Sequence, residues 1–472
     1  MDLPVNSCKK FFFLGHVSFP KCPGFPQTKH PLLGLNCLEA NWTSYRRIQI
    51  PQVLKITKID RALIPLLKRG VLDIDLQIPT SRDICENSSF YPLPSKIFES
   101  KTLVRLKIQF KYGVNIHVKR GVSLPKLRTL HLDYIKIETS TFNKLLSGCH
   151  GLEELVLVNV MWGESEEPSP VTVSIPTLKR LKFCRSKDFY EADFHEYGDY
   201  DEEKEGVSLS FDNPNLVYLE YSDAIVDKYK QVSFDSLVEA NLRLRNTPDG
   251  DQTETDKFNV PKLLMGIRNV KILYLSNDTL EVLACCRRRI RVFDNLIELT
   301  INTTPYVGWE SLPPLLKSCP SLETLVFEGL YHNYTDRCRD KDGCLCKYDN
   351  DWGVKMDVRT CLSSSPVKVL KILKFGKTFD DDDVDRADDD DDDQDAGSCD
   401  EVGDVAEEQI EHVKHFLETM PDLEQVILYY NTPNDQRCDE SIQETSEASS
   451  SSFSYLQCPN KIEEPQLVVF FD

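Results

Sequence analysis

The stretch Leu152–Leu157 reads LEELVL, and it decides the fold because the same L-x-x-L-x-L phrase returns along the chain. Further copies span Leu103–Ile108, Leu127–Leu132, Leu178–Phe183, Leu216–Tyr221, Val270–Leu275, Leu296–Ile301 and Leu322–Phe327, with weaker ones at Val71–Leu76, Leu237–Leu242, Val367–Ile372 and Leu423–Leu428. In leucine-rich repeats the second half of this phrase forms a strand whose alternate side chains face the core. The phrase therefore predicts an α/β fold: an irregular leucine-rich-repeat solenoid with parallel strands on its concave face and helices or loops on its convex face.

The spacing of the copies supports this prediction. Between residues 103 and 178 successive copies begin 24–26 residues apart, which is one strand plus a helix or looser return segment. The segments Ser140–Ser147 and Glu310–Ser318 have apolar residues at helical spacing and are expected to be such returns. Two longer intervals hold the polar stretches Glu191–Glu205 and Thr247–Asp256. These are either recognition loops on one rim or tolerated surface insertions.

Regular repeats carry an asparagine three residues after the L-x-L pair, where its amide caps the turn. Here that position holds other residues: Lys111, Ile135, Val160, Ser186, Ala224, Asp278, Thr304 and Leu330. We therefore expect an irregular arc with loose turns.

Charge and composition limit the classes of partner. The formal net charge is −20, but residues 380–404 alone hold fifteen Asp or Glu and one Arg, so the remainder is only mildly acidic. A nucleic-acid surface needs a basic stripe, so we expect no nucleic-acid partner. No apolar run is long enough to span a bilayer, and Phe11–Leu14 is too short for a signal peptide. We therefore expect no membrane partner, reduced thiols and an intracellular protein of the cytoplasm, the nucleus or both.

The chain divides into four predicted parts. Residues 1–50 are expected to be a poorly ordered N-terminal segment, and residues 51–360 the repeat array. Residues 361–431 are expected to form a strand, a helix over Glu407–Thr419 and a strand, interrupted by a disordered acidic loop at 377–405. Residues 432–472 are a low-complexity tail whose apolar end, Gln466–Phe471, is a candidate to dock.

The order of these phrases resembles plant F-box proteins that carry leucine-rich repeats and a C-terminal FBD-type module. The resemblance covers roughly residues 52–431 and is carried by Leu67–Ile78 (LKRGVLDIDLQI), Tyr91–Phe110 (YPLPSKIFESKTLVRLKIQF), Leu145–Leu157 (LLSGCHGLEELVL) and Leu315–Phe327 (LLKSCPSLETLVF). Ser365–Phe375 followed by Glu407–Tyr430 resembles the FBD unit of strand, helix and strand.

The resemblance implies a substrate-receptor subunit of an SCF-type (cullin-RING) E3 ubiquitin ligase, which binds an unknown target protein through the repeats. In that family an N-terminal F-box holds a Skp-type adaptor, but residues 1–50 contain neither its Leu-Pro-Asp-type opening nor its Ser-x-Arg-Trp closing. The adaptor is thus an expected partner only if a cryptic F-box exists. The alternative is a leucine-rich-repeat interaction protein with no ubiquitin-ligase link, a truncated family member lacking the F-box.

The cysteines include one cluster and two repeated positions. Cys338, Cys344 and Cys346 form either a zinc knuckle or a loop of reduced surface thiols; their C-x-C spacing is tighter than zinc sites favour, so we predict no metal. Cys149 and Cys319 each stand three residues before a repeat's first leucine, which predicts a buried role at a helix-to-strand corner rather than a nucleophile.

No catalytic motif is present in the sequence, so we predict no enzyme, no catalytic residue and no cofactor. The basic run Cys285–Arg289 is either a phosphate or acidic-partner site or a solvated helix end. Four aromatic residues close to predicted strand ends are candidate partner-binding anchors: Tyr134, Trp162, Trp309 and Tyr331. Packing in the core is the alternative role for each of them.

Overall fold

The computed structural model describes residues 47–50, 59–78, 91–93, 95–116, 118, 121–163, 169–186, 208–225, 228–245, 256–285, 293–305, 312–331, 362–377, 401–429 and 466–470. The chain divides into two units. The first comprises Met1–Phe189, Glu196–Glu220 and Val226–Ser236, and the second comprises Tyr190–His195, Tyr221–Ile225 and Leu237–Asp472.

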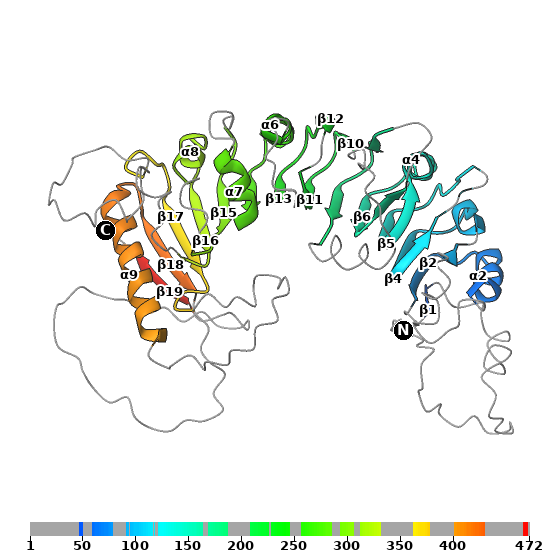
Figure 1. The fold of residues 1–472 in the computed structure, drawn as a ribbon, viewed down its shortest axis with the longest axis horizontal. Helices are drawn as coiled ribbons and strands as arrows, with labels where there is room; N and C mark the ends of the chain where they lie inside the picture. Colours follow the sequence, from blue (N-terminus) through cyan, green and yellow to red (C-terminus); the bar gives the residue numbers. More distant parts are fainter. Residues whose placement is uncertain are drawn as a thin grey trace, which may run out of the picture. The chain divides into compact units, whose positions relative to one another are not determined.

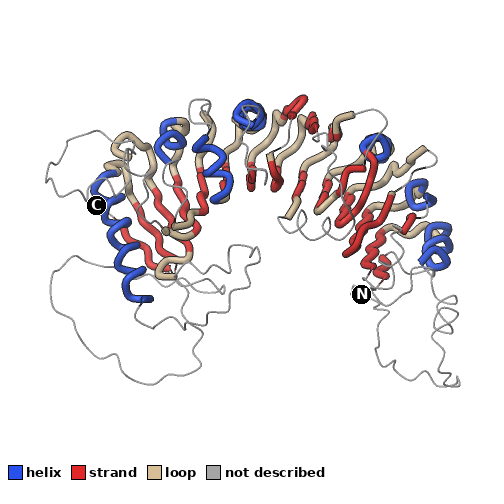
Figure 2. Tube along the Cα trace, in the orientation of Figure 1, coloured by secondary structure: helices blue, strands red, loops and turns tan. Residues whose placement is uncertain are grey.

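The first unit is a mixed α/β structure built on parallel strands (Figure 1). Its elements are β1 (Arg47–Ile50), α2 (Ile59–Lys68), β2 (Asp73–Ile78), β3 (Tyr91–Pro92), η3 (Ser95–Glu99), β4 (Arg105–Asn115), β5 (Thr129–Glu138), α4 (Thr139–Ser147), β6 (Glu154–Val158), β7 (Met161–Gly163), β8 (Val171–Val173), β9 (Arg180–Cys184), β10 (Ser208–Asp212), the start of β11 (Tyr218–Ala224) and β12 (Lys228–Ser233). The strands β1, β2, β4, β5, β6 and β9 pair in that order, all in parallel. The helices α2 and α4 lie on the same side of these strands (Figure 2).

The repeated phrase produces this sheet directly. In every one of the twelve copies a strand begins two residues after the first apolar position, as β5 does after Leu127. Leu130 and Leu132 of β5 are fully buried, whereas Thr129 and His131, which alternate with them, remain partly exposed. The strands are also tied at their starts, where each repeat donates a backbone N–H to the one before. An example is the hydrogen bond from the Arg128 N–H to the Val104 carbonyl, at 2.8 Å.

The two repeated cysteines occupy the predicted corners. Cys149 follows α4 and is fully buried; its N–H donates to the Leu146 carbonyl and its carbonyl accepts from the Leu152 N–H at 3.1 Å. Burial raises the pKa of the Cys149 thiol to about 12, which opposes thiolate chemistry. Cys319 repeats this geometry in the second unit, where its carbonyl accepts from the Leu322 N–H. The prediction of a buried corner role is confirmed for both.

A second sheet, which the sequence analysis did not anticipate, lies in the first unit. Strands β8, β10 and β12 pair in parallel, with β10 between the other two. Helices or loops were expected as return segments, but here three of those segments are strands. Their apolar residues alternate with polar ones, as in SLSF at 208–211, which suits a half-buried strand better than a helix.

Asparagines do secure these return segments, but not at the expected ladder positions. Asn213 is fully buried; its Oδ1 accepts from the Ile175 N–H at 3.0 Å and its Nδ2 donates to the Val173 carbonyl at 2.9 Å. Asn143 of α4 accepts from the Thr172 N–H at 3.1 Å. Both amides thus bind the backbone of β8 and of the residues that follow it.

A third asparagine supports a tight turn after β6. Asn159 adopts a positive φ of 49°, a conformation that Asn tolerates better than most residues. Its buried side chain accepts a hydrogen bond from the Ser186 N–H at 2.8 Å. The capping amide therefore stands one residue earlier than the regular repeat would place it.

The second unit contains β13 (Glu239–Arg245), α6 (Asp256–Gly266), β14 (Ile272–Leu275), α7 (Asn277–Cys285), β15 (Glu298–Asn302), α8 (Leu312–Lys317), β16 (Thr324–Glu328), β17 (Val369–Leu373), α9 (Glu401–Thr419), β18 (Gln425–Tyr429) and β19 (Gln466–Phe470). Its strands pair in chain order. All pairings are parallel from β13 to β18, whereas β19 adds to β18 in the antiparallel direction. The apolar end of the tail therefore docks, as the sequence suggested.

Two predicted boundaries differ from the structure. β1 lies within residues 1–50, which were expected to be poorly ordered, and pairs with β2. The helix expected at Glu407–Thr419 begins at Glu401, so 401–405 of the predicted acidic loop are helical. Residues 1–46 and 378–400 lie outside the described residues.

The buried face of α9 is also rotated from the one expected. The helical spacing of Ile410, Val413, Phe416 and Leu417 in the sequence predicts that these four residues form the core face. In the structure Ile410 is 42% exposed, whereas Phe416 is fully buried. Polar side chains complete the buried face: Gln409, His412 and His415. Gln409 explains the rotation, since its Oε1 accepts from the Gly376 N–H at 2.8 Å and so satisfies the turn after β17.

Candidate protein-binding surface

Outward-facing side chains of the parallel strands form the candidate binding surface. The leucine positions of each repeat point into the core, so the positions between them point the other way. Because the strands are in register, the same repeat position lies side by side from strand to strand: Lys107 is opposite His131, which is opposite Val156, which is opposite Lys182. Each repeat therefore adds a short column of variable side chains to one face.

In the first unit this face is rich in cations. Within the repeated phrases of β4, β5, β6 and β9, at 104–109, 128–133, 153–158 and 179–184, the outward positions hold six basic side chains: Arg105, Lys107, Arg128, Lys179, Arg180 and Lys182. The same positions hold three carboxylates: Asp133, Glu153 and Glu154. This face thus has a positive balance in a chain whose formal net charge is −20.

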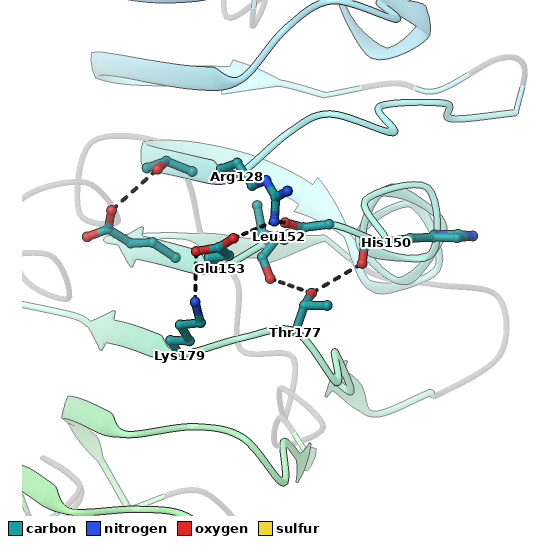
Figure 3. A network of polar contacts seen from close by, with 9 residues as sticks. Arg128, His150, Leu152, Glu153, Thr177 and Lys179 are labelled. Atoms are coloured by element: carbon teal, nitrogen blue, oxygen red, sulfur yellow. Dashed lines mark hydrogen bonds and ion pairs between the residues drawn. The ribbon is translucent and has the colours of Figure 1, made fainter.

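An ion-paired row crosses the starts of three repeats (Figure 3). The Glu153 carboxylate contacts both the Arg128 guanidinium and the Lys179 ammonium, the latter at 3.1 Å. The hydrogen bond from Lys179 and the charges of both cations hold the pKa of Glu153 below its usual range. More than half of each cationic side chain is exposed, so solvent screens these pairs and their effect on stability is small. Glu153 carries one negative charge between two cations, so the row keeps a net positive charge.

Beside this row a threonine joins two neighbouring repeats. Thr177 Oγ1 lies 2.7 Å from the Leu152 carbonyl and 3.2 Å from the His150 carbonyl, and donates toward both (Figure 3). These carbonyls lie in the turn between α4 and β6, where no strand partner reaches them. The hydroxyl therefore satisfies backbone groups that the repeat itself leaves open.

Two ionisable groups lie at the centre of the face. Burial lowers the pKa of His131 to about 4, and the charges of Lys107 and Lys182 lower it as well, so the imidazole is neutral at pH 7. Burial raises the pKa of Asp133 to about 6, although Lys107 and a hydrogen bond with Gln109 act in the opposite direction. Within the described part of the chain, His131 Nε2 and Asp133 Oδ1 are buried and make no hydrogen bond. Such atoms carry a desolvation penalty that a bound hydrogen-bonding group would remove.

The β9 side of the face has its own pairing. Lys182 Nζ lies 2.8 Å from Glu220 Oε1. Burial alone would lower the pKa of Lys182, but the hydrogen bond to Glu220 and the charges of Cys184, Glu220 and Tyr218 together outweigh burial, and the pKa is raised. The Arg180 guanidinium lies 4.3 Å from the centre of the Tyr218 ring, a cation–π contact that leaves its N–H donors available.

The second unit carries a separate polar cluster on its strands. Tyr274 Oη donates to Glu328 Oε2 at 2.9 Å, and the Arg243 guanidinium lies 5.3 Å from the Tyr274 ring centre. Burial raises the pKa of Tyr274, and the nearby Glu328 carboxylate raises it further, against the hydrogen bond from Asn302. Lys374 Nζ lies 3.8 Å from Glu328 Oε1. The Glu328 carboxylate of this cluster thus contacts both a tyrosine hydroxyl and a lysine.

The predicted aromatic anchors of the first unit have different surroundings. Tyr134 lies in β5, is half-exposed and has a positive φ of 53°. Trp162 lies in β7, where its ring packs edge-on against Phe142 at 5.0 Å and stacks on Phe183 at 6.3 Å. Both of those phenylalanines belong to the core, so much of the Trp162 ring serves packing. A role for either residue in partner binding stays a prediction.

The remaining anchors belong to the second unit. Tyr331 is 9% exposed, and its N–H donates to Thr303 Oγ1 at 3.4 Å. Trp309 lies outside the described residues. The binding role of both residues stays a prediction as well.

The predicted cysteine cluster at Cys338, Cys344 and Cys346 also lies outside the described residues, as does most of the basic run after Cys285. Among the residues that the structure does describe, no group of three His, Cys, Asp or Glu is placed to hold a metal ion. In the same residues, no helix is both long and apolar enough to cross a bilayer.

Comparison with known proteins identifies the family. Residues 60–195 match a family model described as the leucine-rich repeats of the FBD-associated F-box protein At5g56370. The chain is 78% identical to the F-box/LRR-repeat protein At5g41840 of Arabidopsis thaliana over 380 residues, covering 79% of this chain and 70% of the relative. The chain belongs to the plant F-box/FBD/LRR-repeat family.

Other members of the F-box/FBD/LRR-repeat family confirm the breadth of the match. The F-box/LRR-repeat protein At4g00320 of the same plant is 57% identical over 379 residues, covering 79% of this chain and 70% of that protein. At3g59250, another Arabidopsis F-box/LRR-repeat protein, is 47% identical over 379 residues, covering 79% and 75%. The repeats matched by the family model run from α2 to β9, so the cation-rich face lies within them. The sequence-based prediction of the family is therefore confirmed.

Proposed function

We propose that this F-box/FBD/LRR-repeat protein is the target-recognition part of an SCF-type E3 ubiquitin ligase, and that it performs no catalysis itself. Its repeats form an irregular leucine-rich-repeat solenoid, and the outward face of the parallel strands binds the target protein. The observation that carries this proposal is the register of β4, β5, β6 and β9, which sets variable side chains side by side above an invariantly apolar core.

The chemistry of this face suits a protein target. Its polar groups are spread over four strands rather than gathered at one point, and a protein surface can contact all of them at once. Partly buried groups such as His131 and Lys182 stand among exposed ones such as Arg105. Interfaces combine such positions, because a few desolvated groups supply most of the affinity and an exposed rim supplies little.

The link to ubiquitin ligation rests on the family. The relatives carry the name F-box/LRR-repeat protein, and an F-box holds a Skp-type adaptor in this family. By this proposal the chain presents its target to the ligase through that adaptor, which requires a cryptic F-box because residues 1–50 contain neither F-box phrase. Tyr134, Trp162, Trp309 and Tyr331 are proposed as additional contacts of the target.

The target-binding half is tested with a pair of matched variants of the full chain. Thr129→Arg with Val156→Arg places two long cations on the outward strand face, where both side chains are partly exposed. Ser140→Arg with Ser147→Arg adds the same charge to α4 on the other side of the strands. Proteins captured by proximity labelling in plant cells, under proteasome inhibition, are then compared between the variants. A target should be lost by at least tenfold from the strand-face variant and retained by the α4 variant.

Equal capture by both variants would show that the target does not use the strand face. The ligase half is tested separately, by co-expressing the tagged chain with a Skp-type adaptor and measuring adaptor recovery. We expect recovery well above that of the tag alone. Recovery no better than the tag would remove the ubiquitin link and leave a leucine-rich-repeat interaction protein.

A further inference from the structure

We infer that the target segment bound by the first unit is acidic, and that two rails of cations on β4 and β9 receive its carboxylates. This inference rests on the proposed function and specifies the chemistry of the partner. The β4 rail is Arg105 with Lys107, and the β9 rail is Lys179, Arg180 and Lys182.

The cations of these rails are only partly neutralised. Lys179 and Lys182 each contact a carboxylate, Glu153 and Glu220 respectively. Arg105, Lys107 and Arg180 form no ion pair among the described residues; Arg105 and Arg180 are exposed, and Lys107 is partly so. Unpaired guanidinium groups at a protein surface bind carboxylates bidentately, with well-defined geometry.

The floor between the rails has little charge of its own. It consists of β5 and β6, whose outward residues there are Thr129, His131, Glu154 and Val156. Thr129 Oγ1 donates to Glu154 Oε2 at 3.4 Å, and His131 is neutral at pH 7 because burial and two nearby lysines lower its pKa. Burial is the larger cause of this lowering, and the charges of Lys107 and Lys182 add to it. Glu154 and, further along β5, Asp133 are carboxylates of this floor, and both oppose the proposed partner.

The geometry also specifies the spacing of the acidic residues. The rails are separated by three interstrand steps, each about 4.8 Å, which places them about 14 Å apart. An extended segment crossing the strands advances about 3.4 Å per residue, so acidic residues four apart reach both rails. The acidic groups Asp73 and Asp75 of β2 and Glu220 of β11 lie beyond the rails and limit the site on each side.

The negative net charge of the chain allows a clear test of an acidic partner. A chain of formal charge −20 repels acidic peptides as a whole, so measurable binding requires a local cationic site. The probe is a fluorescent 20-residue peptide with Glu at every fourth position, and its counterpart has Gln at the same positions. We expect the full chain to bind the Glu peptide at least tenfold more tightly at low ionic strength, with the difference falling as salt is added.

Two variants of equal charge locate the site. Arg105→Glu, Lys107→Glu and Arg180→Glu reverse the unpaired rail cations. Lys68→Glu, Lys96→Glu and Lys144→Glu reverse three exposed lysines on α2, η3 and α4. The rail variant should lose the preference for the Glu peptide. The helix variant should bind the Glu peptide with an affinity within about twofold of the unmodified chain, because its changed charges act only at long range. Circular dichroism checks that both variants fold.

Carbodiimide coupling of the Glu peptide, followed by peptide mapping, gives a readout independent of affinity. Coupling should concentrate at Lys107, Lys179 and Lys182. Equal binding of the Glu and Gln peptides, equal loss in both variants, or coupling chiefly at Lys68, Lys96 and Lys144 would each overturn the inference.

The capture experiment on the strand face is separate: a target lost from the Thr129→Arg and Val156→Arg variant, together with no Glu-peptide preference, would retain the proposed function and reject the acidic partner.

Discussion

Replacing Asn213 by alanine should weaken the second sheet of the first unit strongly. The side chain is fully buried, and it holds the Ile175 N–H at 3.0 Å and the Val173 carbonyl at 2.9 Å. Alanine removes both hydrogen bonds and leaves both backbone groups buried without a partner. The Asn213 N–H bond to the Ser233 carbonyl is made by the backbone and is retained.

The size of the effect follows from those two groups. Each buried group left without a partner costs about 1–3 kcal/mol, so we expect a loss of about 3 kcal/mol in local stability. That corresponds to roughly a 100-fold increase in the opening equilibrium that exposes the Ile175 amide. A chain of two units does not unfold in a single step, so a local measurement is more informative than a global midpoint.

Hydrogen exchange followed by mass spectrometry on peptides covering 171–178 measures this opening. The matched control is Asn215→Ala, because Asn215 is exposed and its one side-chain hydrogen bond, to the Pro176 carbonyl at 2.8 Å, is open to water. We expect the control to change protection by less than about 0.5 kcal/mol. Asn213→Asp keeps the acceptor but sets a carboxylate against the Val173 carbonyl, and it should be at least as damaging at pH 7. If Asn213→Ala accelerates exchange no more than Asn215→Ala does, the reasoning is refuted.

Two further predictions concern a glycine pair and a titrating pair. Gly329 and Gly376 both have positive φ, 84° and 74°, but a Cβ on Gly329 would lie 2.3 Å from the Tyr331 ring whereas one on Gly376 meets nothing within 4 Å. Gly376→Ala should lower the free energy of unfolding, measured with denaturant, by about 1–2 kcal/mol through backbone strain alone. Gly329→Ala should lower it clearly more, because its Cβ also meets the Tyr331 ring. Equal losses would contradict the role of the Tyr331 ring. Asp133 has a raised folded-state pKa, about 6, so the stability it contributes is complete below about pH 4 and is lost as the pH rises through 6. His131, lowered to about 4, contributes stability above about pH 6.5 that is lost as the pH falls through 4. Asp133→Asn should therefore raise the free energy of unfolding at pH 7 by about 1–2 kcal/mol. Below about pH 6.5 the variant should lose stability as His131 becomes protonated. A variant less stable than wild type at pH 7 would contradict this prediction.

The strands were predictable from the sequence because one physical signal determines them. Apolar residues at fixed positions in each repeat, as at Leu127, Leu130 and Leu132, require a strand with one buried side. The corner cysteines followed from the same periodicity. The outward face could likewise be inferred once the register was assumed, since it consists of the residues that the repeat does not specify.

The return segments were less predictable, because their structure depends on neighbours rather than on their own period. Three residues, Val171–Val173, are too few for a periodic signal, and β8 exists because β10 pairs with it. Asn213 stands in an Asp-Asn-Pro-Asn stretch that reads as a simple turn. Its capping role requires the backbone at 173–175, which is close only in the folded chain. The buried face of α9 was misjudged for a similar reason, since Gln409 is buried by its contact with a distant turn.

The candidate binding face was only partly predictable from the sequence. Aromatic residues near strand ends drew attention, yet Trp162 proves to pack on two core phenylalanines. The cations of β4 and β9 were overlooked because these strands are separated in the sequence by two repeats, and only the folded sheet places their cations on one face. Summing charge along the chain hides a positive face, whereas summing it over one side of a sheet reveals it.

The row of Arg128, Glu153 and Lys179 has a consequence for how such genes change. Charges at one position alternate in sign from repeat to repeat, so each repeat is suited to its particular neighbours. Unequal crossing-over that duplicated the Arg128 repeat would set two guanidinium groups side by side. Deletion of the Glu153 repeat would set the Arg128 guanidinium beside the Lys179 ammonium. Repeats that share one backbone design therefore differ in how well their charges suit a given neighbour, although each mismatch costs little at such exposed positions.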